Sequence, residues 1–251
     1  MIRIERVAEP PDFAKVRSKR LAEARQVIAK GDKIEFKDYA AVKRELAEMQ
    51  HLKCCYCEKR EETAENRDVD HYRPKVPYGW LAWTWENLLF ACIDCNRQFK
   101  RNQFPLSPGD IKLVSEQAPP GSERPLVIDP SARQINPSEE IKFRPEKVQG
   151  NQRWRPTGLT KRGLETIRVC GLDRPGLLNS YTDHVNREIR PKVDELLKSI
   201  KTGQPSALYK LWSRTKRQLL RPYRPFQALS LDALDHLVKP DIRTHHNLPL
   251  P

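Results

Sequence analysis

The sequence predicts an α+β protein that is mostly helical and is built around a small core braced by cysteines. Three observations support this class. Apolar residues recur at helical spacing near both ends of the chain, two Cys-x-x-Cys pairs lie in its first half, and short β-favouring stretches alternate with prolines in its middle. At 251 residues, the chain is long enough to bury a substantial core.

Residues 1–50 are expected to form an N-terminal helical segment of two amphipathic helices. Apolar side chains recur every three or four residues on both sides of a break at Gly31 and Asp32. These stripes are more typical of packing than of chemistry. Residues 51–106, which follow, contain both cysteine pairs and are predicted to form a separate core.

Residues 107–156 alternate prolines with β-favouring pieces such as residues 125–128, so we expect an irregular connector with one or two short strands. Helical spacing returns after Thr160, and residues 157–251 are predicted to form a basic helical region. Pro191 falls within its longest apolar stripe and predicts a kink. The last twenty residues are expected to form a loose tail.

The chain is strongly basic. It carries 46 Lys and Arg against 33 Asp and Glu, a formal net charge of +13, and residues 150–225 alone contain 17 basic and 6 acidic residues. A nucleic-acid backbone is the simplest partner for such a surface, because each neutralised phosphate releases counterions. A surface that is merely solvated, or that docks an acidic protein, would show the same excess of charge.

Composition does not favour a membrane or secreted protein. Mean hydropathy is −0.74 and charged residues make up 31% of the chain. No apolar run approaches the roughly 18 residues that a membrane span requires, and the first residues lack the apolar stretch of a secretory signal. We therefore expect a cytoplasmic protein, in which closely spaced cysteines favour a metal site over disulfides.

The four paired cysteines, Cys54, Cys57, Cys92 and Cys95, predict a structural zinc site. A two-residue gap lets both thiolates of a pair reach one ion, and four thiolates complete a tetrahedral shell that cannot activate water. Zinc binding would therefore contribute to folding. A pair of redox dithiols is the alternative, and Cys55, which adjoins the first pair, could compete for the ion.

Asp70 and His71 lie between the two cysteine pairs, and Asn96 directly follows the last cysteine. Phosphodiester hydrolysis requires an activated water and a cation that neutralises phosphoryl charge. Histidine is a neutral base near cellular pH, whereas carboxylate and amide oxygens suit Mg²⁺ or Mn²⁺. We therefore predict His71 as the general base and Asp70 and Asn96 as ligands of a catalytic magnesium ion.

Three stretches resemble the motifs of zinc-containing HNH endonucleases, namely residues 69–75, 85–89 and 92–96. The resemblance implies a zinc-clamped ββα-metal core, in which a two-stranded ribbon and a helix enclose a Mg²⁺ or similar ion. It implies the same roles for His71, Asp70 and Asn96. It also implies that Asn87 ties the ribbon loop together and orients the general base.

More narrowly, the chain is similar to the small HNH nucleases of the PtuB type, which occur in bacterial Septu anti-phage systems and beside some retrons. The similarity rests on residues 54–58, 71–75 and 104–106 and, more loosely, on residues 160–167 and 171–174. Members act with an ATPase, and this chain has no Walker A loop. The resemblance therefore implies a PtuA-type ATPase partner in a hetero-oligomer.

One departure from the relatives concerns phosphate binding. Many relatives carry lysine three residues after the position of Asn96, where this chain has Phe99 followed by Lys100 and Arg101. We treat Arg73, Lys75, Lys100 and Arg101 as candidate nucleic-acid contacts.

The predicted activity is cleavage of DNA to 5′-phosphate and 3′-hydroxyl ends. Two other functions stay open: a zinc-stabilised nucleic-acid binding or adaptor module with a vestigial nuclease site, and an RNase on the same scaffold.

Overall fold

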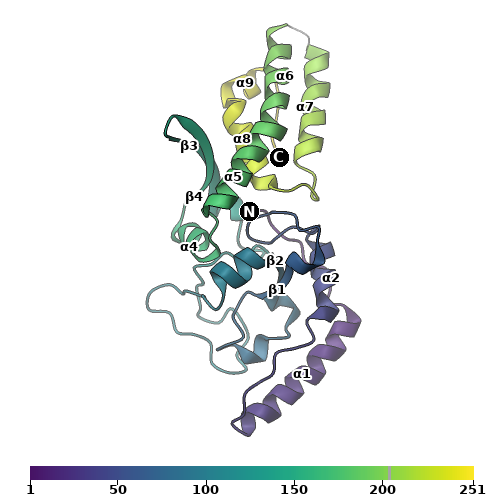
Figure 1. Ribbon diagram of the computed structural model, residues 1–251, viewed down its shortest axis with the longest axis vertical. Helices are drawn as coiled ribbons and strands as arrows, with labels where there is room; N and C mark the ends of the chain where they lie inside the picture. Colours follow the sequence, from purple (N-terminus) through teal and green to yellow (C-terminus); the bar gives the residue numbers. More distant parts are fainter. Residues whose placement is uncertain (203–204) are drawn as a thin grey trace.

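The computed structural model describes residues 1–202 and 205–251, so residues 203 and 204 of the predicted C-terminal region lie outside it. The α+β class is confirmed. Within the described part, two small antiparallel sheets lie among helices that contain far more residues. The molecule is elongated, with the first helix near one end and a pair of helices from the C-terminal region at the other (Figure 1). None of the described helices has both the length and the apolar character needed to cross a membrane.

The first fifty residues form the two expected helices, α1 (Pro11–Ala29) and α2 (Ala40–Met49). The break between the two helices lies at Gly31, as expected. Gly31 has a φ of 75°, a conformation that glycine adopts without strain. Both helices pack against one face of the central ribbon through a cluster that includes Trp83 and Trp85, each at most 2% exposed. Trp83 and Trp85 are therefore core residues.

The central ribbon consists of β1 (Arg67–His71) and β2 (Leu88–Cys92), which pair antiparallel with Asp70 opposite Leu89 and His71 opposite Leu88. A helix of the π type, η4 (Asp94–Lys100), follows β2 directly. Side chains alternate between the two faces of a strand, so Asp68 and Asp70 lie on one face of β1 and His71 lies on the other. Short 3₁₀ turns flank the strands at Ala64–Asn66, Gly79–Leu81 and Trp85–Asn87.

The second sheet contains β3 (Ile141–Val148) and β4 (Asn151–Gly158), joined by a turn in which Gln149 and Gly150 have positive φ. The connector therefore contains strands as expected. However, residues 125–128 form no strand, and only an isolated bridge joins Leu106 to Pro125. Val127 and Ile128 are instead fully buried in the main core, which accounts for their apolar character.

The C-terminal region is helical, as expected. Its helices are α4 (Lys161–Cys170), α5 (Pro175–His184), the π segment η5 (Val185–Ile189), α6 (Arg190–Lys201), α7 (Pro205–Leu219), α8 (Gln227–Leu237) and α9 (Pro240–His245), whereas the short α3 (Pro137–Glu140) lies in the connector, just before β3. Pro191 occupies the first turn of α6, and the π segment η5 ends just before that turn, so the kink predicted at Pro191 stays a prediction. The expectation of a loose tail was wrong. Leu248 is 1% exposed, and the Trp212 indole N–H donates to the Pro249 carbonyl.

Candidate functional site

The two cysteine pairs converge on a single point. The Sγ atoms of Cys54, Cys57, Cys92 and Cys95 lie within 4.8 Å of one another, and all four residues are buried. A tetrahedral ion with Zn–S bonds of about 2.3 Å places its sulfurs about 3.8 Å apart, and the Sγ atoms of Cys57 and Cys92 are separated by 3.8 Å. Cys55 does not belong to this group. The donor set therefore fits a structural zinc ion.

Backbone hydrogen bonds hold both cysteine turns. The amide of Glu58 donates to the Cys54 carbonyl, and the amide of Cys95 lies 3.5 Å from the Cys92 sulfur. Glu58, at a φ of 59°, directs the chain away after the first pair. Arg174, just before α5, approaches the cluster with a guanidinium nitrogen 3.5 Å from the Cys95 sulfur. This cation opposes the negative charge that four thiolates would leave on a bound zinc.

His71 is placed at the end of β1 as an anchored and neutral imidazole. It is 7% exposed, and its Nε2 lies 2.9 Å from the carbonyl oxygen of Ala82. A carbonyl can only accept, so Nε2 carries the proton and Nδ1 keeps its lone pair. Burial, followed by the positive charge of Lys75, lowers the pKa of His71 to about 3. The ring is therefore neutral at cellular pH and has one nitrogen available as a base.

Aromatic side chains from the linker between α1 and α2 cover this histidine. The ring of Tyr39 meets His71 edge-on at 4.7 Å and stacks on Trp83 at 6.0 Å. The Lys75 ammonium lies 5.6 Å from the Tyr39 ring and 5.1 Å from that of Phe36. Beneath these rings, little of the His71 surface is exposed.

Asp70 faces the opposite side of the ribbon and is 1% exposed. Its Oδ1 accepts a hydrogen bond of 3.0 Å from the Lys100 ammonium, and its Oδ2 accepts one of 2.6 Å from the Tyr56 hydroxyl. The Lys100 ammonium, also fully buried, donates a second bond of 2.7 Å to the carbonyl of His71. Both carboxylate oxygens of Asp70 are thus engaged by the protein.

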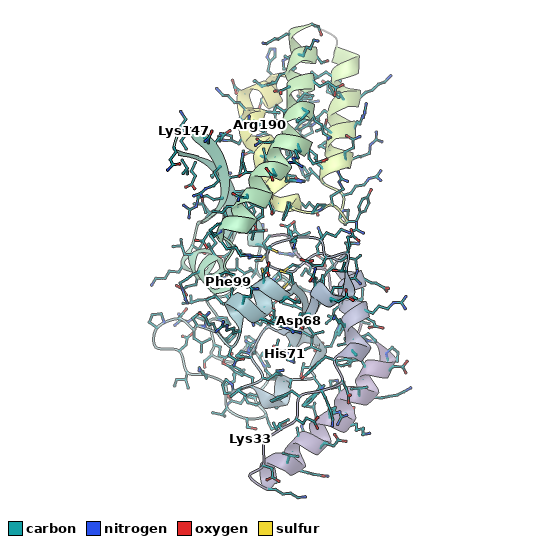
Figure 2. All side chains as sticks on the ribbon, in the orientation of Figure 1. Lys33, Asp68, His71, Phe99, Lys147 and Arg190 are labelled. Atoms are coloured by element: carbon teal, nitrogen blue, oxygen red, sulfur yellow. The ribbon has the colours of Figure 1, made fainter. Side chains whose placement is uncertain are left out.

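Asn96 lies beside a different acid. Its amide nitrogen donates to Asp68 Oδ2 at 2.8 Å, and the Arg97 guanidinium holds both Asp68 oxygens at 2.8 and 3.1 Å. In the described part of the chain, the Asn96 side-chain oxygen accepts no hydrogen bond. The charge of Asp68 acts on both His71 and Lys75, partly offsetting the effects that lower their pKa. Figure 2 shows Asp68 and His71 in the same half of the molecule.

Asn87 connects the two sides of the ribbon loop. Its side-chain oxygen accepts from the Arg73 amide at 2.8 Å, and its nitrogen donates to the carbonyls of Arg73 and Leu81 at 3.0 and 3.1 Å. Leu81 precedes Ala82, whose carbonyl holds the histidine. These bonds agree with the expected role of Asn87, although its effect on His71 stays a prediction.

The four basic residues predicted to contact phosphate lie in different environments. Arg73 is buried and pairs with Glu123 at 2.9 Å, and Lys100 is buried against Asp70. Lys75 is half-buried next to the histidine, and Arg101 is exposed. The geometry therefore favours Lys75 and Arg101 over Arg73 and Lys100, and all four assignments stay predictions.

Sequence reasoning did not single out two residues of this site. Asp68 shares a face of β1 with Asp70, and the alternation of a strand was a signal that could have identified it. Tyr39 belongs to the apolar stripe of the N-terminal segment, and no local pattern indicated that its ring would cover His71.

No family model matches the chain. The chain is similar to the Septu protein PtuB of Bacillus mycoides (strain KBAB4), with 27% identity over 274 aligned positions. The alignment covers 91% of this chain and 88% of that protein, so it extends well beyond the cysteine-rich segment. The chain is thus similar, along most of its length, to a Septu protein.

Proposed function

We propose that the chain is a metal-dependent HNH endonuclease that hydrolyses DNA phosphodiester bonds. The neutral imidazole of His71 carries this proposal, because its Nε2 is anchored to the Ala82 carbonyl and its Nδ1 keeps a lone pair. The ring ends a strand that pairs with β2, and η4 follows at once. This order of two strands and a helix is the one that the ββα-metal resemblance implies.

In this proposal, Nδ1 of His71 takes the proton of the attacking water. Burial keeps the ring neutral beforehand, and the Ala82 carbonyl stabilises the imidazolium that forms. The hydrogen bonds of Asn87 hold the segment that carries this carbonyl. Lys75, half-buried beside the ring, is placed to bind a phosphate oxygen of the substrate.

A Mg²⁺ or Mn²⁺ ion, when bound, would neutralise phosphoryl charge and stabilise the leaving 3′ oxygen. Asn96 offers a side-chain oxygen that accepts no hydrogen bond from the described residues. Asp70, the predicted second ligand, must exchange its bond to Lys100 to take that role, whereas Asp68 already lies beside Asn96. We therefore propose Asn96 with Asp70 as the oxygen ligands, and Asp68 as the competing acid on the same face of β1.

The zinc cluster acts as a brace in this account. Cys92 ends β2 and Cys95 lies in η4, so an ion held by the four thiolates fixes the helix that carries Asn96 relative to the ribbon that carries His71. Zinc binding would therefore stabilise the fold without taking part in the reaction.

We further propose that the chain is the nuclease of an anti-phage complex with an ATPase of the PtuA type. The similarity to a Septu protein supports the defence role. The covered His71 supports control by a partner, because an isolated chain with a buried base is poorly accessible to DNA. Two alternatives to a DNA endonuclease are a zinc-stabilised adaptor with a vestigial nuclease site and an RNase on the same scaffold.

The test compares the wild type with His71→Ala on supercoiled plasmid, single-stranded DNA and RNA, with Mg²⁺ and with the candidate ATPase present or absent. His245→Ala, at an exposed histidine of α9, is the matched control. We expect magnesium-dependent nicking of plasmid by the wild type and the control, and none by His71→Ala. Binding without cleavage would support the adaptor, and cleavage of RNA alone would support the RNase.

A further inference from the structure

A basic cleft lies in the C-terminal region. It has a volume of about 530 Å³ and is lined by Glu188, Lys192, Arg214, Arg217, Gln218, Arg221, Tyr223 and Arg224. These residues come from η5, α6, α7 and the loop after α7. The hairpin of α6 and α7 occupies the end of the molecule opposite α1, whereas the β1–β2 ribbon lies in the other half (Figure 1). The basic cleft is therefore separate from the candidate site around His71.

The basic cleft has far more positive than negative charge. Five of its lining residues are basic and one, Glu188, is acidic. The Glu188 carboxylate lies 3.8 Å from the Lys192 ammonium and 3.3 Å from the Arg224 guanidinium. Within the described residues, Arg214 and Arg217 form no ion pair, and both are exposed. An excess of unpaired cations in a concave surface attracts a polyanion, because the walls concentrate the field.

The side chains of the basic cleft are better suited to bind phosphate groups than the carboxylates of an acidic protein. Four of the five cations are arginines, whose planar forks bind phosphate oxygens in pairs. Tyr223 is 42% exposed, and its hydroxyl accepts a hydrogen bond of 2.9 Å from Arg221. An exposed aromatic ring among arginines provides a stacking surface for a base beside contacts to the backbone.

We propose that the basic cleft binds the phosphodiester backbone of a nucleic acid at a second site, distant from His71. The proposal rests on the proposed function only for the choice of nucleic acid as the ligand. It requires no cleavage, so binding can be measured on His71→Ala protein without magnesium. A failure of the nuclease assignment would leave this measurement intact.

The test measures binding of a short labelled DNA duplex by fluorescence anisotropy over a range of salt concentrations. The variant Arg214→Gln/Arg217→Gln/Arg221→Gln removes three exposed cations of the basic cleft, all on the His71→Ala background. The control Arg133→Gln/Lys147→Gln/Lys161→Gln removes three exposed cations outside the cleft. Thermal unfolding of both variants shows whether each remains folded.

We expect the cleft variant to bind DNA about tenfold more weakly or worse, and the slope of log K against log salt to fall by about 2 to 3, close to one for each lost phosphate contact. The control should change the slope by less than about 1. Equal losses in both variants would overturn the proposal in favour of diffuse charge. Unchanged DNA binding, with a cleft-dependent affinity for poly-glutamate, would overturn it in favour of an acidic protein partner. Displacement of the labelled duplex by free AMP as effective as displacement by unlabelled duplex would assign the cleft to a mononucleotide instead.

Discussion

Replacing Lys100 with methionine tests the ion pair beneath the candidate site. The Lys100 side chain is 0% exposed and that of Asp70 is 1% exposed, with 3.0 Å between nitrogen and oxygen. The Lys100→Met variant keeps most of the side-chain volume, but among the described residues it leaves the buried Asp70 carboxylate with the Tyr56 hydroxyl as its remaining hydrogen-bond donor. Removing one member of a buried pair costs about 3 to 5 kcal/mol, because the other charge stays uncompensated.

For a chain of this size, that loss lowers the melting temperature by about 6 to 20 °C. The assay is urea unfolding followed by circular dichroism, with Lys19→Met, at an exposed lysine of α1, as the control. The control should stay within about 0.5 kcal/mol of the wild type. Adding Asp70→Asn to Lys100→Met should recover part of the loss, because the amide carries no charge.

The same variant shows whether Asp70 can hold a divalent ion. If it does, Mg²⁺ takes the place of the ammonium, and saturation to 100 times the dissociation constant stabilises Lys100→Met by about 2.7 kcal/mol. An unfolding free energy within about 1 kcal/mol of the wild type would refute the reasoning about the buried pair. A destabilised variant that Mg²⁺ does not affect would transfer the proposed ligand role to Asp68.

Three further predictions concern the zinc, the cover and the pH dependence. Cys57→Ser should lose zinc and solubility, whereas Cys170→Ala, at a buried cysteine outside the cluster, should retain one zinc by metal analysis; a stable zinc-free Cys57→Ser protein would contradict the clamp. Tyr39→Ala should increase nicking by the isolated chain because it uncovers His71, whereas Tyr39→Phe, which keeps the ring, should not; equal rates in plasmid assays would show that Tyr39 does not restrict access. Burial lowers the pKa of His184 to about 4, so as the pH falls from 6.5 the unfolded chain takes up a proton at this histidine before the folded chain does, and the free energy of unfolding should fall by at most about 3 kcal/mol between pH 6.5 and 4. His184→Gln should reduce this fall, and a pH profile of urea unfolding that the substitution leaves unchanged would contradict the prediction.

The cysteine cluster was predictable from sequence because the spacing within each pair is set by local geometry. The helices were predictable for the same reason, since apolar periodicity is local. The partners of Asp70 and Asn96 were not. Lys100 is buried in the last turn of η4, a π helix, and no pattern in the sequence indicates this form of helix.

Long-range packing explains the other differences. The apolar residues at 125–128 favoured a strand, yet they pack as irregular chain, with the Ile128 amide held by the Thr166 hydroxyl of α4. The last residues contain prolines and few apolar positions. They pack against α7, where the Trp212 indole N–H donates to the Pro249 carbonyl. Neither contact leaves a periodic signal, because its two partners lie more than thirty residues apart.

Plasmid nicking by zinc-loaded His71→Ala, measured with Mg²⁺ and the candidate ATPase, tests the central claim most directly. Zinc content and melting temperature are measured on the same preparation, so that loss of activity is separated from loss of fold. The account predicts a folded protein with one zinc that no longer nicks DNA, while the wild type produces 5′-phosphate and 3′-hydroxyl ends. Nicking at the wild-type rate by the His71→Ala protein would contradict it.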